Sequence, residues 1–118
     1  MLLDFRFQNY KSFLEEACFS MMAAPKQKGL DYSLFNIKKH GKDIKGLCSS
    51  VIYGSNAAGK TTVVGAMDTF RSIVLRGHIR NSEDLSSPNH AASNLSLIPN
   101  SSLTKAEPVE FFIDFIVD

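Results

Sequence analysis

Eight consecutive residues of this sequence have the types and the spacing of a phosphate-binding loop. Residues 54–61 read "GSNAAGKT" and satisfy the pattern G-x-x-x-x-G-K-[ST] at every fixed position. Glycines let such a loop curl closely around phosphate oxygens, and its N–H groups lie at the positive end of the helix that follows. A lysine and a hydroxyl complete the chemistry, since they can meet the terminal phosphates and Mg²⁺. The pattern therefore predicts a nucleotide site.

Each position of this loop has an expected role. Lys60 supplies a compact positive charge for the β- and γ-phosphates, Thr61 is the expected Mg²⁺ ligand, and Thr62 is placed to donate to the α-phosphate. ATP and Mg²⁺ are accordingly the expected cofactors. The alternative is a glycine-rich strand-to-helix turn that carries a lysine by chance. The residues predicted to bind the nucleotide are Gly54, Ser55, Asn56, Ala57, Ala58, Gly59, Lys60, Thr61 and Thr62.

The residues on either side of the loop predict the elements that position it. Before it, "CSSVIYG" over residues 48–54 predicts a short apolar strand. After it, apolar residues recur every three or four positions, which predicts an amphipathic helix from Lys60 to Arg76 that ends at Gly77. The apolar positions of this helix are Val63, Met67, Phe70 and Val74.

The rest of the chain predicts strands around this unit. Residues 3–7 alternate between apolar and charged side chains, as in a half-buried strand. Residues 13–23, "FLEEACFSMMA", predict a second strand antiparallel to the first, with a helix as the alternative. Residues 34–47 predict two short strands that turn near His40 and Gly41, and residues 109–118 predict a last strand. Residues 81–108 are rich in Ser, Asn and Pro, which favours a long surface loop.

Charge and cysteine content limit the classes of partner. Thirteen Lys and Arg residues nearly balance twelve Asp and Glu residues, so net charge gives no argument for a nucleic-acid or membrane partner. The lysine-rich residues 26–45 are expected to form a solvated hairpin. Cys18 and Cys48 have no metal-binding spacing and are expected to be buried, reduced thiols. Charges near the N-terminus interrupt any signal peptide, and no apolar run could span a bilayer, so a cytoplasmic location is expected.

Two segments carry a resemblance to a known group of ATPases. "GSNAAGKTT", with Asn56 in third place, resembles the G-x-N-x-[AS]-G-K-[ST] loops of the SMC and RecF group of ABC-type ATPases. "FRFQNYKSF", residues 5–13, resembles the strand and turn that open those proteins. The chain as a whole looks most like the start of bacterial AAA-family ATP-binding proteins related to OLD nucleases and abortive-infection ATPases. The resemblance implies that Lys11 and Ser12 also lie near the nucleotide, although Lys11 has the simpler interpretation of a solvated turn lysine.

The resemblance also implies a fold and a division of the chain. It implies an α/β P-loop NTPase fold, the incomplete N-terminal half-lobe of an ABC-type ATPase, with antiparallel strands beside a strand–loop–helix unit. The expected parts are a β-rich arm over residues 1–46, the strand, loop and helix over 47–77, a Ser/Asn-rich loop over 78–108 and a strand over 109–118. The parent protein would be an ATPase of a defence or a DNA- or RNA-processing system.

The sequence lacks the other parts that ATP hydrolysis needs. A carboxylate must hold the Mg²⁺ shell and a second group must activate water. No apolar run followed by Asp-Glu and no Leu-Ser-Gly-Gly-like signature follows the loop. "FIVD", ending at Asp118, is the nearest imitation, but its alternation with Asp114 favours a sheet with one wet face. We therefore expect an N-terminal fragment of a larger protein that binds ATP without turning it over efficiently.

Three further expectations about partners and activity remain open at this stage. An open sheet edge predicts self-association or pairing with the remaining half of the ATPase lobe. A non-enzymatic interaction module that uses such an edge is the alternative function. A GTPase is disfavoured because no guanine-reading N-K-x-D sequence is present, and a small P-loop kinase because Arg76 and Arg80 are the only candidates for its lid arginines. Nucleic-acid binding is expected only in a full-length context, because the lysine-rich residues lack interleaved aromatics.

Overall fold

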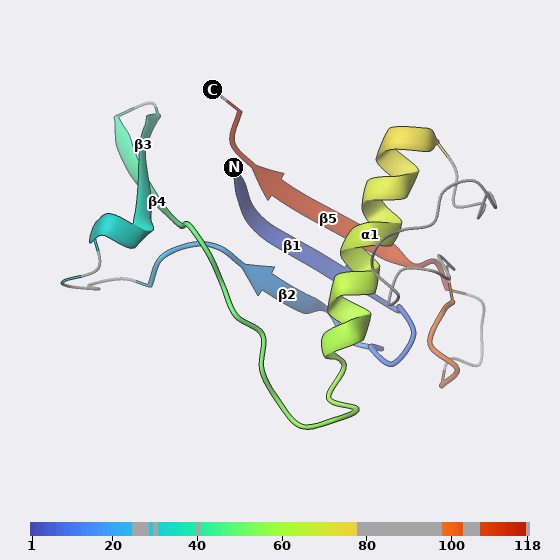
Figure 1. Cartoon of the computed structure of the whole chain (residues 1–118). Coiled ribbons are helices and arrows are strands. Elements are labelled where there is room, and N and C mark those ends of the chain that lie inside the picture. The colour runs from blue at the N-terminus through green and yellow to red at the C-terminus, as the bar shows by residue number, and fades with distance from the viewer. Residues whose placement is uncertain (25–28, 30, 40, 78–97, 103–106, 118) are drawn as a thin grey trace.

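A computed structural model of the chain describes residues 1–24, 29, 31–39, 41–77, 98–102 and 107–117 (Figure 1). Within these residues it is a small mixed α/β domain with two antiparallel sheets and one α-helix. In chain order the elements are β1 (Leu2–Gln8), β2 (Ala17–Ser20), the 3-10 helix η1 (Asp31–Ser33), β3 (Leu34–Lys39), β4 (Lys42–Leu47), α1 (Lys60–Arg76) and β5 (Glu110–Phe115).

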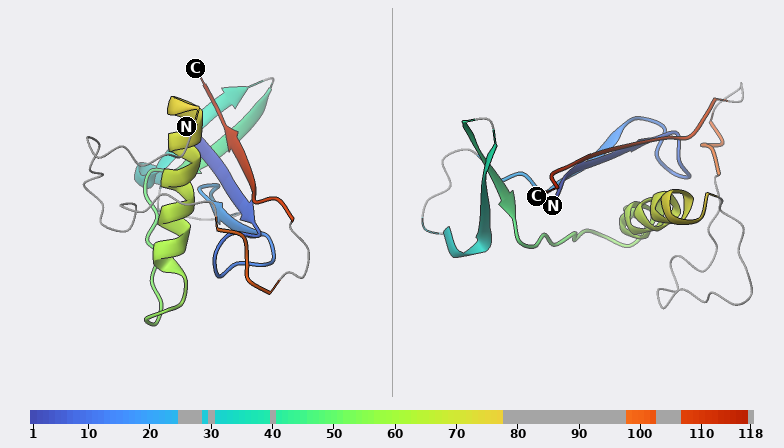
Figure 2. Two further views of the ribbon diagram at one scale, coloured as in Figure 1. Left: turned by 90° about the vertical axis from the view of Figure 1, so that its right-hand side faces the viewer. Right: turned by 90° about the horizontal axis from the view of Figure 1, so that it is seen from above.

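The larger sheet has the strand order β2-β1-β5, with β1 in the middle and antiparallel to both neighbours. Phe5 of β1 lies opposite Phe19 of β2 and Ile113 of β5, which fixes the register across the sheet. Helix α1 lies across one face of this sheet, while the β3–β4 hairpin stands apart from it, as Figure 2 shows. The segment 48–59 runs between the hairpin and the helix.

The core between sheet and helix is aromatic. Phe5 and Phe7 alternate with charged residues along β1, so both point to the helix side, where they are 2% and 0% exposed. Phe5 packs on Phe70 of α1 and on Phe111 of β5, with ring centroids 5.7 and 6.2 Å away. The alternation that predicted the first strand therefore also defines its buried face. Tyr10 and Ala66 complete the buried cluster.

Most of the predicted elements are confirmed. The helix runs from Lys60 to Arg76 and ends at Gly77, which has φ 72° and donates its N–H to the carbonyl of Ile73. Residues 17–20 form a strand antiparallel to β1, which excludes the helix considered there. Gly41, with φ 74°, connects β3 to β4 close to the expected turn, and the last strand forms as β5. His40 and most of the predicted loop 78–108 lie outside the described residues.

The strand predicted over residues 48–54 is wrong. These residues are extended but pair with no strand in the described part of the chain. Val51 and Tyr53 are 80% and 91% exposed, so the apolar run is not buried either. A strand needs the hydrogen bonds of a neighbouring strand, and the described sheets offer none at this position.

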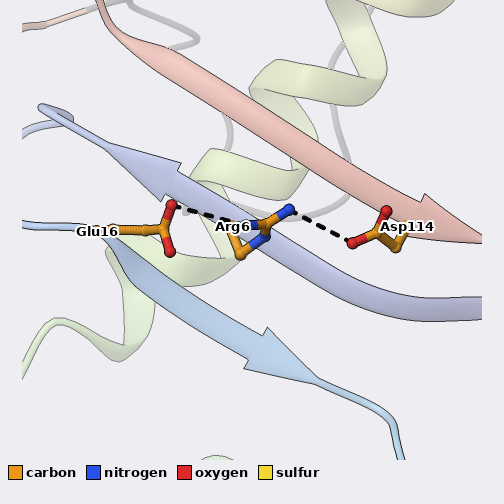
Figure 3. A network of polar contacts seen from close by, with 3 residues as sticks. All are labelled: Arg6, Glu16 and Asp114. Atoms are coloured by element: carbon orange, nitrogen blue, oxygen red, sulfur yellow. Dashed lines mark hydrogen bonds and ion pairs between the residues drawn. The ribbon is translucent and has the colours of Figure 1, made fainter.

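The face of the sheet opposite α1 carries charged side chains. Arg6 lies between Glu16 and Asp114, with nitrogen–oxygen distances of 3.9 and 3.4 Å, as Figure 3 shows. Its guanidinium carbon also lies 5.3 Å from the ring centroid of Phe112. All three charged groups are substantially exposed, so these ion pairs add little to stability.

No helix in the described residues is long and apolar enough to cross a membrane.

Cys18 and Cys48 are free thiols, and the prediction that they are buried is wrong, because both are exposed. Cys18 lies in the four-residue strand β2 opposite Arg6, on the face of the sheet that α1 does not cover. A period-two pattern puts one residue in two on that open face.

We expect the thiol of Cys18 to react slowly with alkylating reagents until the pH approaches its raised pKa. Although Cys18 is exposed, its neighbours still remove part of the water around the thiol. This desolvation, followed by the charge of Asp4, disfavours the thiolate and raises the pKa of Cys18 above its ordinary value. Alkylation by iodoacetamide, followed against pH in the Cys48→Ser variant, should therefore have a higher midpoint in the folded chain than in urea. Equal midpoints would contradict this assignment. The raised pKa also affects stability. The protonated Cys18 thiol contributes to the free energy of unfolding below the ordinary thiol pKa, and this contribution is lost as pH rises through the pKa of Cys18 in the folded chain.

Candidate functional site

The glycine-rich loop leads directly into the first turn of α1. Gly59 occupies the N-cap position with φ 85°, and no side chain caps the helix there. The first N–H groups of a helix have no partner within the helix, and they carry its positive partial charge. Ala57, with φ 64°, is a second left-handed residue of this loop. A left-handed residue that is not glycine costs about 1 kcal/mol or more, and such strain is found where a loop is shaped for a ligand.

A pocket of about 240 Å³ opens at this helix start. Seven of the nine predicted loop residues line it, Asn56 through Thr62, together with Ser12 from a distant part of the chain. The lining contains the Lys60 ammonium and several hydroxyl groups, and none of its residues is acidic. The structure therefore brings together eight of the eleven predicted site residues, and Gly54, Ser55 and Lys11 lie outside the lining.

Gly54 and Ser55 lie outside this lining but contact its lysine. The Lys60 ammonium donates to the carbonyl oxygens of Gly54 at 2.8 Å and of Ser55 at 2.6 Å. The loop is also closed on itself, since the N–H of Ala58 donates to the Ser55 carbonyl at 3.3 Å. Lys60, at the start of α1, is thus hydrogen-bonded to the beginning of the loop.

The turn 9–13 delivers Ser12 to the pocket. Tyr10 and Phe13 exchange two backbone hydrogen bonds of 2.9 and 3.0 Å, which leaves Lys11 and Ser12 at the tip. Lys11 does not line the pocket, and its ammonium lies 5.3 Å from the centroid of the Tyr10 ring. Of the two residues that the resemblance added, the structure brings only Ser12 to the loop.

Phe13 is a contact of the loop that the sequence did not reveal. A Cβ atom built on Gly59 would lie 2.8 Å from Cζ of Phe13, closer than real side-chain atoms approach. Phe13 is itself held edge-on against Phe7 of the core, with ring centroids 5.1 Å apart. The loop therefore rests on an aromatic ring that permits only glycine beneath it.

Two asparagines fix the turn that carries Ser12. Asn9 is buried, and its side-chain NH₂ donates to the carbonyls of Glu107 and Pro108 at 2.8 and 3.1 Å. Its side-chain oxygen accepts from the N–H of Asn100 at 2.8 Å, and the Asn100 amide donates to the Lys11 carbonyl at 2.8 Å. The turn, Asn100 and the residues before β5 are thereby tied together.

Comparisons with protein families, with curated proteins and with solved structures found no match to this chain. A helix N-terminus, an ammonium and hydroxyl donors, with no carboxylate in the lining, form an environment for an anion with several oxygens.

The same lining fits a metal ion only when a ligand brings most of the oxygens. No group of three or more His, Cys, Asp or Glu side chains is gathered anywhere in the described residues. Thr61 lines the pocket and offers one hydroxyl oxygen. Mg²⁺ commonly takes one or two protein oxygens together with phosphate oxygens and water, so this donor set suits Mg²⁺ that arrives with a polyphosphate.

Proposed function

We propose that residues 54–62 bind the phosphates of Mg-ATP. The observation that carries this proposal is the pocket at the start of α1, which is lined by Ser12 and residues 56–62, Lys60 among them, and by no acidic residue. The phosphates would accept hydrogen bonds from the free N–H groups of the loop and the first helical turn. Lys60 would contact the terminal phosphates from its present position across the loop.

Thr61 would hold Mg²⁺ between its hydroxyl and the phosphate oxygens. When bound, the ion would neutralise part of the phosphate charge. Thr62, which follows in the first turn, would donate its hydroxyl to the phosphate nearest the ribose. Ser12, which comes from the turn 9–13, would add a further hydroxyl.

The wider proposal is that the chain is the nucleotide-binding portion of an ABC-type ATPase, similar to the SMC and RecF group. It is supported by the N-terminal strand, turn and loop, and by the contact between turn and loop through Phe13 and Gly59. Such a protein would act in the cytoplasm, where ATP is abundant, in a defence or nucleic-acid-processing system. Hydrolysis is not part of the proposal for this chain, because no carboxylate lines the pocket.

Titration with a fluorescent ATP analogue in the presence of Mg²⁺ tests the proposal. The Lys60→Ala variant should bind about 10- to 100-fold more weakly, because it loses charge-assisted contacts of about 1.5–3 kcal/mol. Lys42→Ala is the matched control, since Lys42 is an exposed lysine on β4, and it should bind like the unsubstituted chain. Equal affinity for all three chains, or no binding by any of them, would refute the proposal.

A further inference from the structure

Strand β5 forms an open edge of the larger sheet. It pairs with β1, and no other strand in the described residues pairs with its far side. Ile116 donates its N–H to the Met1 carbonyl, on the β1 side. Because backbone N–H groups alternate in direction along a strand, those of Phe111, Ile113 and Phe115 point to the open edge. An edge of this kind offers a row of donors and acceptors to another strand.

Apart from the charges of Glu110 and Asp114, this edge lacks the features that usually prevent pairing. Residues 110–117, "EFFIDFIV", contain no Lys, Pro or Gly. Phe112, Phe115 and Val117 are 41%, 58% and 67% exposed. The other strands are better protected, since β2 has only four residues and the β3–β4 hairpin carries several lysines. The tendency to pair is therefore concentrated on β5.

We propose that two copies of this chain associate edge to edge through β5, as an antiparallel pair centred on Ile113. Directly opposite residues of an antiparallel pair lie on the same face, so the two-fold axis must lie midway between one residue and its own copy in the other chain. Centring the pair on Phe112 would place Asp114 against Glu110, and centring it on Asp114 would place two aspartates together. Like charges directly opposite each other are destabilising. Centring on Ile113 avoids both contacts.

The Ile113 register is also favourable on both faces. Phe111 of one copy lies opposite Phe115 of the other, on the face that α1 covers, and these aromatic pairs stabilise a sheet. Asp114 lies opposite Phe112, whose ring is in contact with Arg6 in its own chain. The N–H groups of Phe111, Ile113 and Phe115 all obtain partners. In this register the second copy places no two like charges directly opposite each other, and the association does not depend on nucleotide binding.

Light scattering after size exclusion, over a wide range of concentrations, tests the association. The unsubstituted chain should pass from monomer to dimer as concentration rises. Phe115→Lys should weaken dimerisation about tenfold or more, because the charge enters the two-fold interface twice. Val51→Lys is the matched control, since it replaces another exposed apolar side chain, away from the sheet, and should dimerise normally. A monomer at every concentration, or loss of dimer only in Val51→Lys, would overturn the proposal.

Cysteine cross-linking tests the register on a chain whose edge is otherwise intact. In the Cys18→Ser, Cys48→Ser background, Ile113→Cys should form an intermolecular disulfide, because opposite Cα atoms lie about 5.5 Å apart, within reach of the bond. Phe112→Cys should cross-link with an Asp114→Cys chain more readily than with itself. Preferential self-linking by Phe112→Cys or by Asp114→Cys would exclude the Ile113 register and overturn the proposal as stated.

Discussion

The Gly59→Ala variant is expected to lose measurable ATP binding and about 2–4 kcal/mol of stability, from left-handed strain and overpacking together. Gly59 has φ 85°, a backbone conformation that costs a residue with a side chain about 1–2 kcal/mol. Its new methyl group would also lie 2.8 Å from Cζ of Phe13, so the ring or the loop must move. A displaced loop would no longer direct its N–H groups at the phosphates.

The other end of the same helix supplies the control. Gly77 has φ 72°, and a Cβ atom there would meet nothing within 4 Å. Gly77→Ala therefore carries the backbone strain alone and should leave ATP affinity unchanged. Urea unfolding and ATP titration of both variants measure the difference. In the double variant Phe13→Leu, Gly59→Ala, part of the lost stability should return, because the smaller side chain relieves the contact. Unchanged ATP binding by Gly59→Ala would show that the loop is not the site.

Local patterns predicted the helix and most strands because the information lies in neighbouring residues. The spacing of Val63, Met67 and Phe70 marks one face of α1, and Gly77 ends the helix through its own backbone freedom. The alternation of Phe5 and Phe7 with charged residues likewise determines the buried face of β1. These features can be recognised in the sequence without any knowledge of distant contacts.

The predicted strand over residues 48–54 failed for the opposite reason. "VIY" has the composition of a buried strand, but composition does not supply a neighbour, and a strand forms only with a partner strand. In the described residues these side chains are exposed, Tyr53 at 91%. The prediction that the two cysteines are buried failed in a related way, because burial depends on which face of an element is covered.

The same distinction between local and distant information applies to the candidate site. The loop residues are contiguous in sequence, so a pattern finds them together. Their support is not contiguous: Asn9 and Asn100 are 91 residues apart, and Phe13 meets Gly59 only through the packing of the turn on the helix. The resemblance suggested the turn but favoured Lys11 equally with Ser12, and side-chain position separates them, since only Ser12 lines the pocket.

Asn9→Ala is expected to destabilise the chain by about 3 kcal/mol or more. Asn9 is 3% exposed and has φ 52°, a conformation that asparagine tolerates better than alanine. Its side chain makes three hydrogen bonds, to the carbonyls of Glu107 and Pro108 and from the N–H of Asn100. Alanine would leave these groups without partners and would add backbone strain. Urea unfolding measures the loss, with Asn36→Ala on exposed β3 as the control, expected to change stability by less than about 0.5 kcal/mol.

Two further substitutions of Asn9 separate the effect of backbone strain from that of the lost hydrogen bonds. Asn9→Gly removes the strain but not the loss of hydrogen bonds, so it should destabilise less than alanine by about 1 kcal/mol. Asn9→Asp keeps the acceptor for Asn100 but places a charge against the carbonyls of Glu107 and Pro108, which costs more as the carboxylate ionises. Its stability should therefore fall as pH rises through the carboxyl range, whereas that of Asn9→Gly should not. Because Asn9 holds the turn that carries Ser12, all three variants should also weaken ATP binding while folded. A variant as stable as Asn36→Ala would show that the turn is held by other contacts, with the Tyr10 hydroxyl on Thr69 as the next to substitute.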